Sequence, residues 1–212
     1  MMICEELFLL LTKDTGSPEK WGGTEIYGLR GAVLADLIAL GRLAVDDGPR
    51  IRVIDASPTG HPALDQALRV LPAKHGAEIS PLTTWCKIEP HDGVVASLSQ
   101  QGVITISSGG LLGVRTTYPT VDPAPERALR QRLYAVLRGE QEATDPDRIL
   151  LCIVHALGID PKIFPQEATG LGKKDLKLRI RQLAGSDITG QDIHQTIQAI
   201  RAAIAMTPLS GT

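Results

Sequence analysis

Residues 21–43 read WGGTEIYGLRGAVLADLIALGRL, and this stretch decides the fold. After its opening glycines, apolar side chains recur every three or four positions and predict one long helix with a single apolar stripe (Ile26, Leu29, Val33, Leu37 and Leu40). A second stripe consists of small residues, beside which a neighbouring helix can approach closely (Gly28, Gly31, Ala35 and Ala39). A helix that accepts neighbours on more than one face belongs at the centre of a bundle.

The start of this helix is a candidate binding site. Trp21 stands just before the Gly22-Gly23 turn, and Arg30 lies within the first turns of the helix. An indole and a guanidinium at a helix start can make a phosphate site, because free backbone N–H groups and the helix dipole already favour an anion there. The alternative is a half-buried Trp and a solvated Arg, and these residues alone leave both interpretations open.

Composition favours a helical protein that does not bind nucleic acid. The chain has 212 residues, of which 43% are hydrophobic and only 3% are aromatic, so its core must consist of Leu, Ile, Val and Ala. The formal net charge is -2, from 22 basic and 24 acidic residues. A protein that binds nucleic acid through counterion release is usually basic, so this balance argues against a nucleic-acid partner.

Cysteine spacing and hydropathy predict a cytoplasmic protein without a structural metal or disulfide. Cys4, Cys86 and Cys152 are far apart and form no CxxC pair, so we expect three reduced and mostly buried thiols. The apolar N-terminus carries Glu5 and Glu6 and has no basic segment, so it does not resemble a signal peptide. No apolar run reaches the roughly 18 residues that a membrane span needs, so any membrane contact must be peripheral.

The rest of the chain predicts one helical domain over residues 1–212. A second run, ILLCIVHAL at 149–157, is apolar on every side and must form another buried helix, with Asp145 or Thr144 as its cap and Gly158 as its end. The expected class is therefore all-α, a single globular domain around a buried central helix pair. Further helices are expected at 3–12, 63–71, 81–87, 91–101, 123–139, 171–184 and 191–205. Two small β-hairpins are expected at 43–56 and 102–118.

Five motifs follow one another in a recognisable order. They are EELFLLLT at 5–12, GLRGAVLADLIALGRL at 28–43, SPTGHPALDQAL at 57–68, GVITI at 102–106 and DPDRILLCIVHALGI at 145–159. Together they resemble the Golgi phosphoprotein 3 family of phosphatidylinositol 4-phosphate-binding proteins, in one of its bacterial branches. The resemblance implies an almost wholly helical, non-enzymatic domain without a cofactor, which sits on a membrane and docks the cytosolic tails of membrane proteins.

The resemblance also implies a shallow headgroup pocket, made by a Trp before the central helix, an Arg within it and two basic residues from a later helix. Trp21 and Arg30 match the first two, whereas the later positions fall at Ile88 and His91, with Lys87 one residue away. The expected headgroup set is therefore Trp21, Arg30, Lys87 and His91. A basic residue near an anionic surface contributes about 1 kcal/mol, and millimolar binding needs about 4 kcal/mol. We therefore expect weak binding of an anionic phospholipid headgroup.

The second hairpin offers an apolar contact. Leu111 and Leu112 lie beside the glycines at its tip and are expected to meet a membrane or a second subunit, which would make a homo-oligomer through residues 102–118. Fully burying one leucine contributes about 1.5–3 kcal/mol, enough to complement a weak headgroup site. The alternative is that both leucines fold onto their own domain.

Three other functions compete with a peripheral adaptor on the inner face of the membrane. A cytosolic protein-binding scaffold of the same fold would account for the missing basic positions. A winged-helix DNA-binding domain would place Arg115 on its wing, but the preceding helix HDGVVASLSQQ has no Arg or Lys. An enzyme would need Asp36, Asp55 and His61 to converge, and no catalytic sequence motif accompanies them.

Overall fold

A computed structural model describes residues 1–17, 25–46, 50–76, 87–109 and 115–185. These residues form nine α-helices, one 3₁₀ helix and two separate two-stranded antiparallel sheets, so the predicted all-α class with two small hairpins is confirmed. The helices are α1 (Ile3–Leu11), α2 (Glu25–Ala39), α3 (Pro62–Val70), η1 (Leu71–Lys74), α5 (Pro90–Gln100), α6 (Ala124–Arg138), α7 (Asp145–Ala156), α8 (Asp160–Ile163), α9 (Gln166–Thr169) and α10 (Lys173–Gly185).

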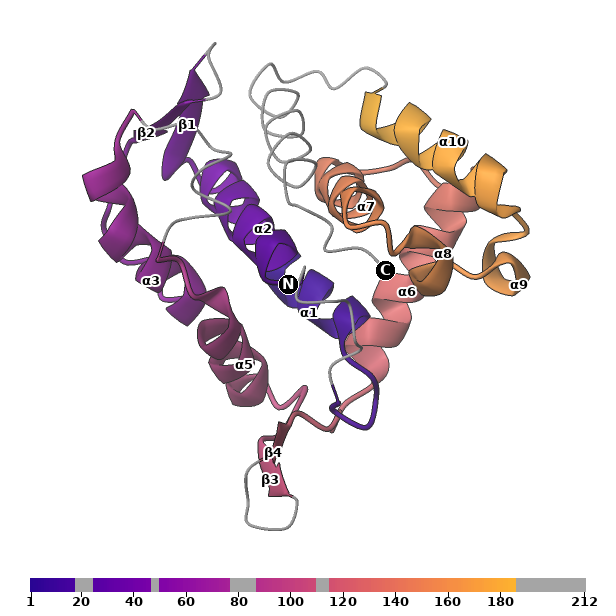
Figure 1. Ribbon diagram of the computed structural model, residues 1–212, viewed down its shortest axis with the longest axis horizontal. Coiled ribbons are helices and arrows are strands. Elements are labelled where there is room, and N and C mark those ends of the chain that lie inside the picture. The colour runs from indigo at the N-terminus through magenta and orange to yellow at the C-terminus, as the bar shows by residue number, and fades with distance from the viewer. Residues whose placement is uncertain (18–24, 47–49, 77–86, 110–114, 186–212) are drawn as a thin grey trace, which may run out of the picture.

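Helices α1, α2 and α7 form the centre of the molecule, with α3 and α5 on one side and α6 and α8–α10 on the other (Figure 1). The predicted central pair, α2 and α7, is present, and α1 joins it as a third buried helix because all nine of its residues are buried. The stripe of small residues on α2 lets neighbouring segments approach closely. A Cβ atom on Gly28 would lie 2.8 Å from the Leu157 side chain and 3.3 Å from Leu7. The predicted inward position of Leu40 is wrong, because its side chain is 45% exposed just beyond the end of α2.

The α3–α5 layer is held by close backbone contact. A Cβ atom on Gly93 would lie 2.5 Å from the backbone nitrogen of Ala63, so the two helices cross at this glycine. Pro90 begins α5 in its first turn, where the missing N–H is not needed. Of the helix predicted at 81–87, residues 81–86 lie outside the described part of the chain, and Lys87 is not helical.

Both hairpins form, and the second projects from one end of the molecule (Figure 1). Strand β1 (Leu43–Asp46) pairs with β2 (Arg50–Val53), and β3 (Ser107–Gly109) pairs with β4 (Arg115–Thr117). The paired strands of the second hairpin begin at Ser107, later than the predicted start at residue 102. Val103 and Ile104 are buried instead, and among the described residues a single bridge joins Ile104 to Thr120. The tip residues Leu111 and Leu112 lie outside the described residues.

The ends of the C-terminal helices follow local sequence signals. The Thr144 hydroxyl accepts a hydrogen bond from the Asp147 backbone nitrogen at the start of α7, and Pro146 occupies its first turn, as predicted. Gly158 adopts a positive φ of 70° just beyond α7, a conformation that glycine tolerates best. The helix predicted at 191–205 falls outside the described residues.

Candidate functional site

Arg30 of α2 is joined to the segment that precedes α5. Its Nε donates a hydrogen bond of 2.7 Å to the carbonyl oxygen of Ile88, which is 58 residues later in the chain. This contact places the guanidinium one residue from Lys87. Trp21, the aromatic member of the predicted headgroup set, lies outside the described residues.

Lys87 is held in place through its backbone rather than its side chain. Its carbonyl oxygen accepts a 3.0 Å hydrogen bond from Nε2 of Gln66 in α3, and its side chain is exposed. The next residue, Ile88, has no exposed surface and belongs to the hydrophobic core. Because Ile88 points inward, the exposed basic residue of this segment is Lys87, one position before the place where the family pocket expects it.

His91 belongs to an aromatic cluster at the base of the second hairpin. Its ring makes edge contacts with Tyr118 and Phe8, at centroid distances of 5.2 and 5.7 Å. Its Nδ1 lies 3.0 Å from Oδ1 of Asp92, and its side chain is 41% exposed. Burial, and then the charge of Asp92, raise the pKa of Tyr118. His91 therefore joins α1, α5 and the hairpin, and these contacts hold its ring at the hairpin base.

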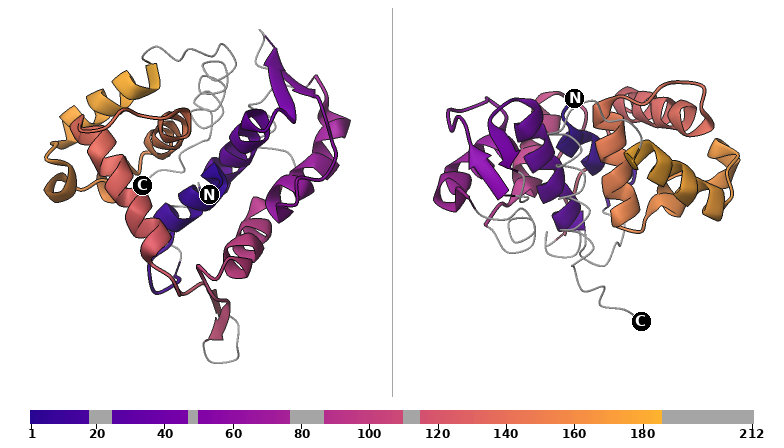
Figure 2. Two further views of the ribbon diagram at one scale, coloured as in Figure 1. Left: turned by 180° about the vertical axis from the view of Figure 1, so that it is seen from behind. Right: turned by 90° about the horizontal axis from the view of Figure 1, so that it is seen from above.

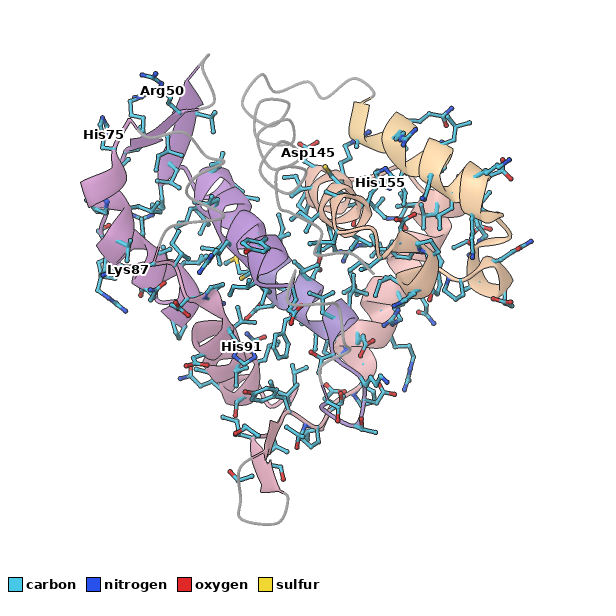
Figure 3. All side chains as sticks on the ribbon, in the orientation of Figure 1. Arg50, His75, Lys87, His91, Asp145 and His155 are labelled. Atoms are coloured by element: carbon cyan, nitrogen blue, oxygen red, sulfur yellow. The ribbon has the colours of Figure 1, made fainter. Side chains whose placement is uncertain are left out.

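The surface around Lys87 and His91 carries acids as well as bases. In Figure 3, Lys87 lies at the outer edge of the α3–α5 layer, and His91 lies further toward the hairpin. Glu89 and Asp92 are exposed between and beside them. Glu25 occupies the first turn of α2, and one of its carboxylate oxygens is buried without a hydrogen bond. These carboxylates offset the charges of Arg30 and Lys87, so the described residues here do not form a strongly basic surface.

The residues suggested for catalysis do not all converge, although the Asp36 carboxylate lies near enough to His61 for an electrostatic interaction. The Asp36 carboxylate accepts hydrogen bonds from the backbone nitrogens of Ile3 and Cys4, at 2.8 and 2.9 Å, and so caps α1. Asp55 pairs with Arg42 and Ser57 at the surface, whereas His61 faces Glu5 in the interior. No cluster of three or more potential metal ligands occurs among the residues that the structure describes.

The main polar feature of the interior was not anticipated from the sequence. Glu5 accepts hydrogen bonds from the side chains of Ser97 and Gln101, at 2.7 and 2.6 Å, and from the backbone nitrogen of Met2. His61 Nε2 lies 3.3 Å from the same carboxylate. The only sequence signal was a pair of acids in an apolar segment, which helix-dipole reasoning alone explains equally well.

The fold and these contacts define a mostly helical domain whose buried charges hold its helices together. Residues 3–200 match the family described as Golgi phosphoprotein 3 (GPP34), and the chain belongs to that family. The match extends beyond residue 160, where the recognisable motifs end. Membership fits a lipid-binding adaptor, and the family is not a known enzyme family. None of the helices in the described ranges is long and apolar enough to cross a membrane.

Proposed function

We propose that the protein is a non-enzymatic peripheral membrane adaptor of the bacterial branch of its family. It binds an anionic lipid headgroup, similar to phosphatidylinositol 4-phosphate, at the inner face of the membrane. The observation that supports this proposal is the hydrogen bond from Arg30 to the Ile88 carbonyl, because it links the central helix to the segment that carries the exposed Lys87. Trp21 supplies the aromatic wall of the site, and the body binds the cytosolic tails of membrane proteins.

The proposed headgroup site needs support from other contacts. Arg30 and Lys87 contribute about 1 kcal/mol each near an anionic surface. Stable attachment of a peripheral protein takes two signals, one of which can be apolar. Leu111 and Leu112 at the hairpin tip provide that second signal, toward the membrane or toward a second copy of the chain. The exposed side chain of Ile106, at the base of the same hairpin, adds to the apolar surface.

Vesicle flotation with a charge reversal tests the headgroup site. Lys87→Glu suits this purpose, because the Lys87 side chain is exposed and only its backbone carbonyl holds the segment. We expect wild type to float with phosphatidylcholine vesicles that contain phosphatidylserine or phosphatidylinositol 4-phosphate, and the variant to bind at least about tenfold more weakly. Arg127→Glu is the matched control, since Arg127 is an exposed cation on α6. Equal flotation of wild type and Lys87→Glu would contradict the proposal.

A cytosolic protein-binding scaffold is the second candidate function. The observation that favours it is the mixed charge around the site, where Glu89 and Asp92 are exposed beside Lys87. A scaffold would not float with any of the vesicles, and Leu111→Asp would change neither its flotation nor its sedimentation. The adaptor requires that Leu111→Asp lowers vesicle binding or dissociates a dimer in sedimentation.

A further inference from the structure

Helix α10 presents a basic face to solvent. Its apolar side chains at three- and four-residue spacing are buried against the body, namely Leu176, Ile180 and Leu183. Its opposite side carries four exposed cations and one exposed carboxylate, that of Asp175. The exposed cations are Lys173, Lys174, Lys177 and Arg181.

No described side chain engages these four cations. Arg179 of the same helix donates to the carbonyl oxygens of Leu137 and Val136 in the last turn of α6. Arg138 of α6 pairs with Glu140. Within the described ranges, by contrast, the exposed lysines and Arg181 of α10 form no ion pair or side-chain hydrogen bond, so their charge is available to a partner.

An apolar side chain lies in the middle of the basic face. Leu178 is 56% exposed, and it follows Lys174 by four residues and precedes Arg181 by three. These spacings place all three side chains on one stripe of the helix. A leucine surrounded by cations suits an anionic lipid surface, where the cations meet phosphates and the leucine enters the boundary between headgroups and acyl chains. A nucleic acid offers no such apolar layer.

We propose that the outward face of α10 is a second contact with anionic phospholipid. This inference rests on the proposed membrane function and extends it, because it adds a second lipid contact to the headgroup site. In Figures 1 and 2, α10 and the α3–α5 layer lie at opposite ends of the long axis of the molecule. Two contacts so far apart reinforce each other only when both reach the same surface, and the combined variant below tests this.

The full chain is tested with phosphatidylcholine vesicles with and without phosphatidylserine. Lys177→Gln/Arg181→Gln removes two exposed charges, and we expect binding to the anionic vesicles to fall about thirtyfold, with a weaker dependence on salt. Leu178→Ala is expected to lower binding about threefold at any salt concentration, because it removes only apolar contact. Arg127→Gln on α6 is the matched control. Thermal melting establishes that each variant is folded, as expected for exposed positions.

The outcomes separate the two lipid contacts. Wild-type binding by the α10 double variant, together with loss by Lys87→Glu, would overturn this inference and leave the headgroup site standing. Loss of vesicle binding in the α10 double variant but not in Lys87→Glu would support the inference and contradict the headgroup site. Losses that multiply when both changes are combined show that both regions touch one surface. Binding of polyglutamate that is as tight as vesicle binding and independent of Leu178 would overturn the lipid assignment in favour of an acidic protein.

Discussion

Glu5 and Glu6 are neighbours on α1, and both are buried, yet they connect α1 to opposite halves of the molecule. Glu5 accepts hydrogen bonds from Ser97 and Gln101 of α5 and faces His61 at the start of α3. Glu6 instead receives both of its side-chain bonds, at 2.9 Å each, from Arg132 of α6. Helix α1 is therefore held to the α3–α5 half through several donors to Glu5, and to the α6 half through the single guanidinium of Arg132.

The two carboxylates respond to burial in opposite ways. Burial alone raises the pKa of Glu5, but the hydrogen bonds from His61, Met2, Ser97 and Gln101 together lower it from 4.5 to about 2. Burial also raises the pKa of Glu6, and there it prevails over Arg132, which Glu6 shares with Asp147. In this pair, four donors outweigh the burial of Glu5 and lower its pKa, whereas the burial of Glu6 and the nearby charge of Asp147 outweigh Arg132 and raise its pKa.

The largest effect is expected from removing the guanidinium of Arg132, which Glu6 and Asp147 share. Arg132→Met leaves the carboxylates of Glu6 and Asp147 buried without their cation, and Asp147 has no exposed surface. We expect a loss of about 3–5 kcal/mol in the free energy of unfolding, measured by urea denaturation at neutral pH. A loss below about 1 kcal/mol would show that this half of the molecule does not depend on the ion pairs. Arg127→Met, at an exposed position on the same helix, is the control.

The next largest effect is expected from the amide substitutions at Glu5 and Glu6. Glu5→Gln replaces a carboxylate that accepts four hydrogen bonds by an amide, whose NH₂ group can only donate. We expect the free energy of unfolding to fall by about 3 kcal/mol at neutral pH. Glu6→Gln removes a carboxylate that burial disfavours and leaves Arg132 paired with Asp147, so we expect about 1 kcal/mol or less. Equal losses in the two variants would contradict the comparison.

The same difference has a signature in the pH dependence of stability. The folded pKa of Glu5 is depressed, so its contribution of about 3 kcal/mol is present above the unfolded value of 4.5 and is lost as the pH falls toward about 2. Glu6 acts in the opposite direction. Its folded pKa is raised, so acidification through that value relieves a penalty. Denaturant titrations at a series of pH values should therefore show a shallower acid decline in Glu5→Gln than in wild type, and a steeper one in Glu6→Gln.

The smallest expected effect is the loss of one donor. Ser97→Ala removes the 2.7 Å hydrogen bond to Glu5 and leaves the other donors in place. We expect a loss of about 1.5 kcal/mol and an upward shift of the Glu5 pKa. The variant should consequently lose its stability at a higher pH than wild type in acid unfolding. Ser99→Ala, a half-buried position on the same helix, is the control and should leave the acid transition unchanged.

The interior networks also bear on the proposed membrane function. Three arginines of α6 are engaged within the fold, since Arg130 and Arg138 pair with Glu126 and Glu140, and Arg132 pairs with Glu6. Lys87 and the exposed cations of α10 are among those that remain at the surface for a lipid. This explains why a chain with a net charge of -2 can still present a basic surface locally.

Much of the fold could be predicted because its signals are local. The 3.6-residue period of α2 and the apolar run of α7 are confirmed, as are the Thr144 cap and the end of α7 at Gly158. Leu40 shows the limit of the same reasoning. It continues the apolar period, but α2 ends at Ala39, so the side chain beyond it is not directed toward the core.

The candidate site was predictable only in part. The motif order placed the chain in its family and drew attention to Arg30 and Lys87, and the Arg30 side chain donates to the carbonyl oxygen of Ile88, the residue after Lys87. His91 stays a prediction as a headgroup ligand, and its partly exposed ring also packs against Phe8 and Tyr118. Those partners come from α1 and from the return of the hairpin, so no local spacing around His91 reveals them.

The sequence by itself therefore determined which segments are helices, where they end and which faces are apolar, because periodicity and capping act within a few residues. Only the tertiary structure decided what each charge does. Glu5 meets Gln101 across 96 positions of the chain, and Glu6 meets Arg132 across 126. A carboxylate in an apolar segment must find donors when it is buried, but which donors reach it depends on how the helices cross.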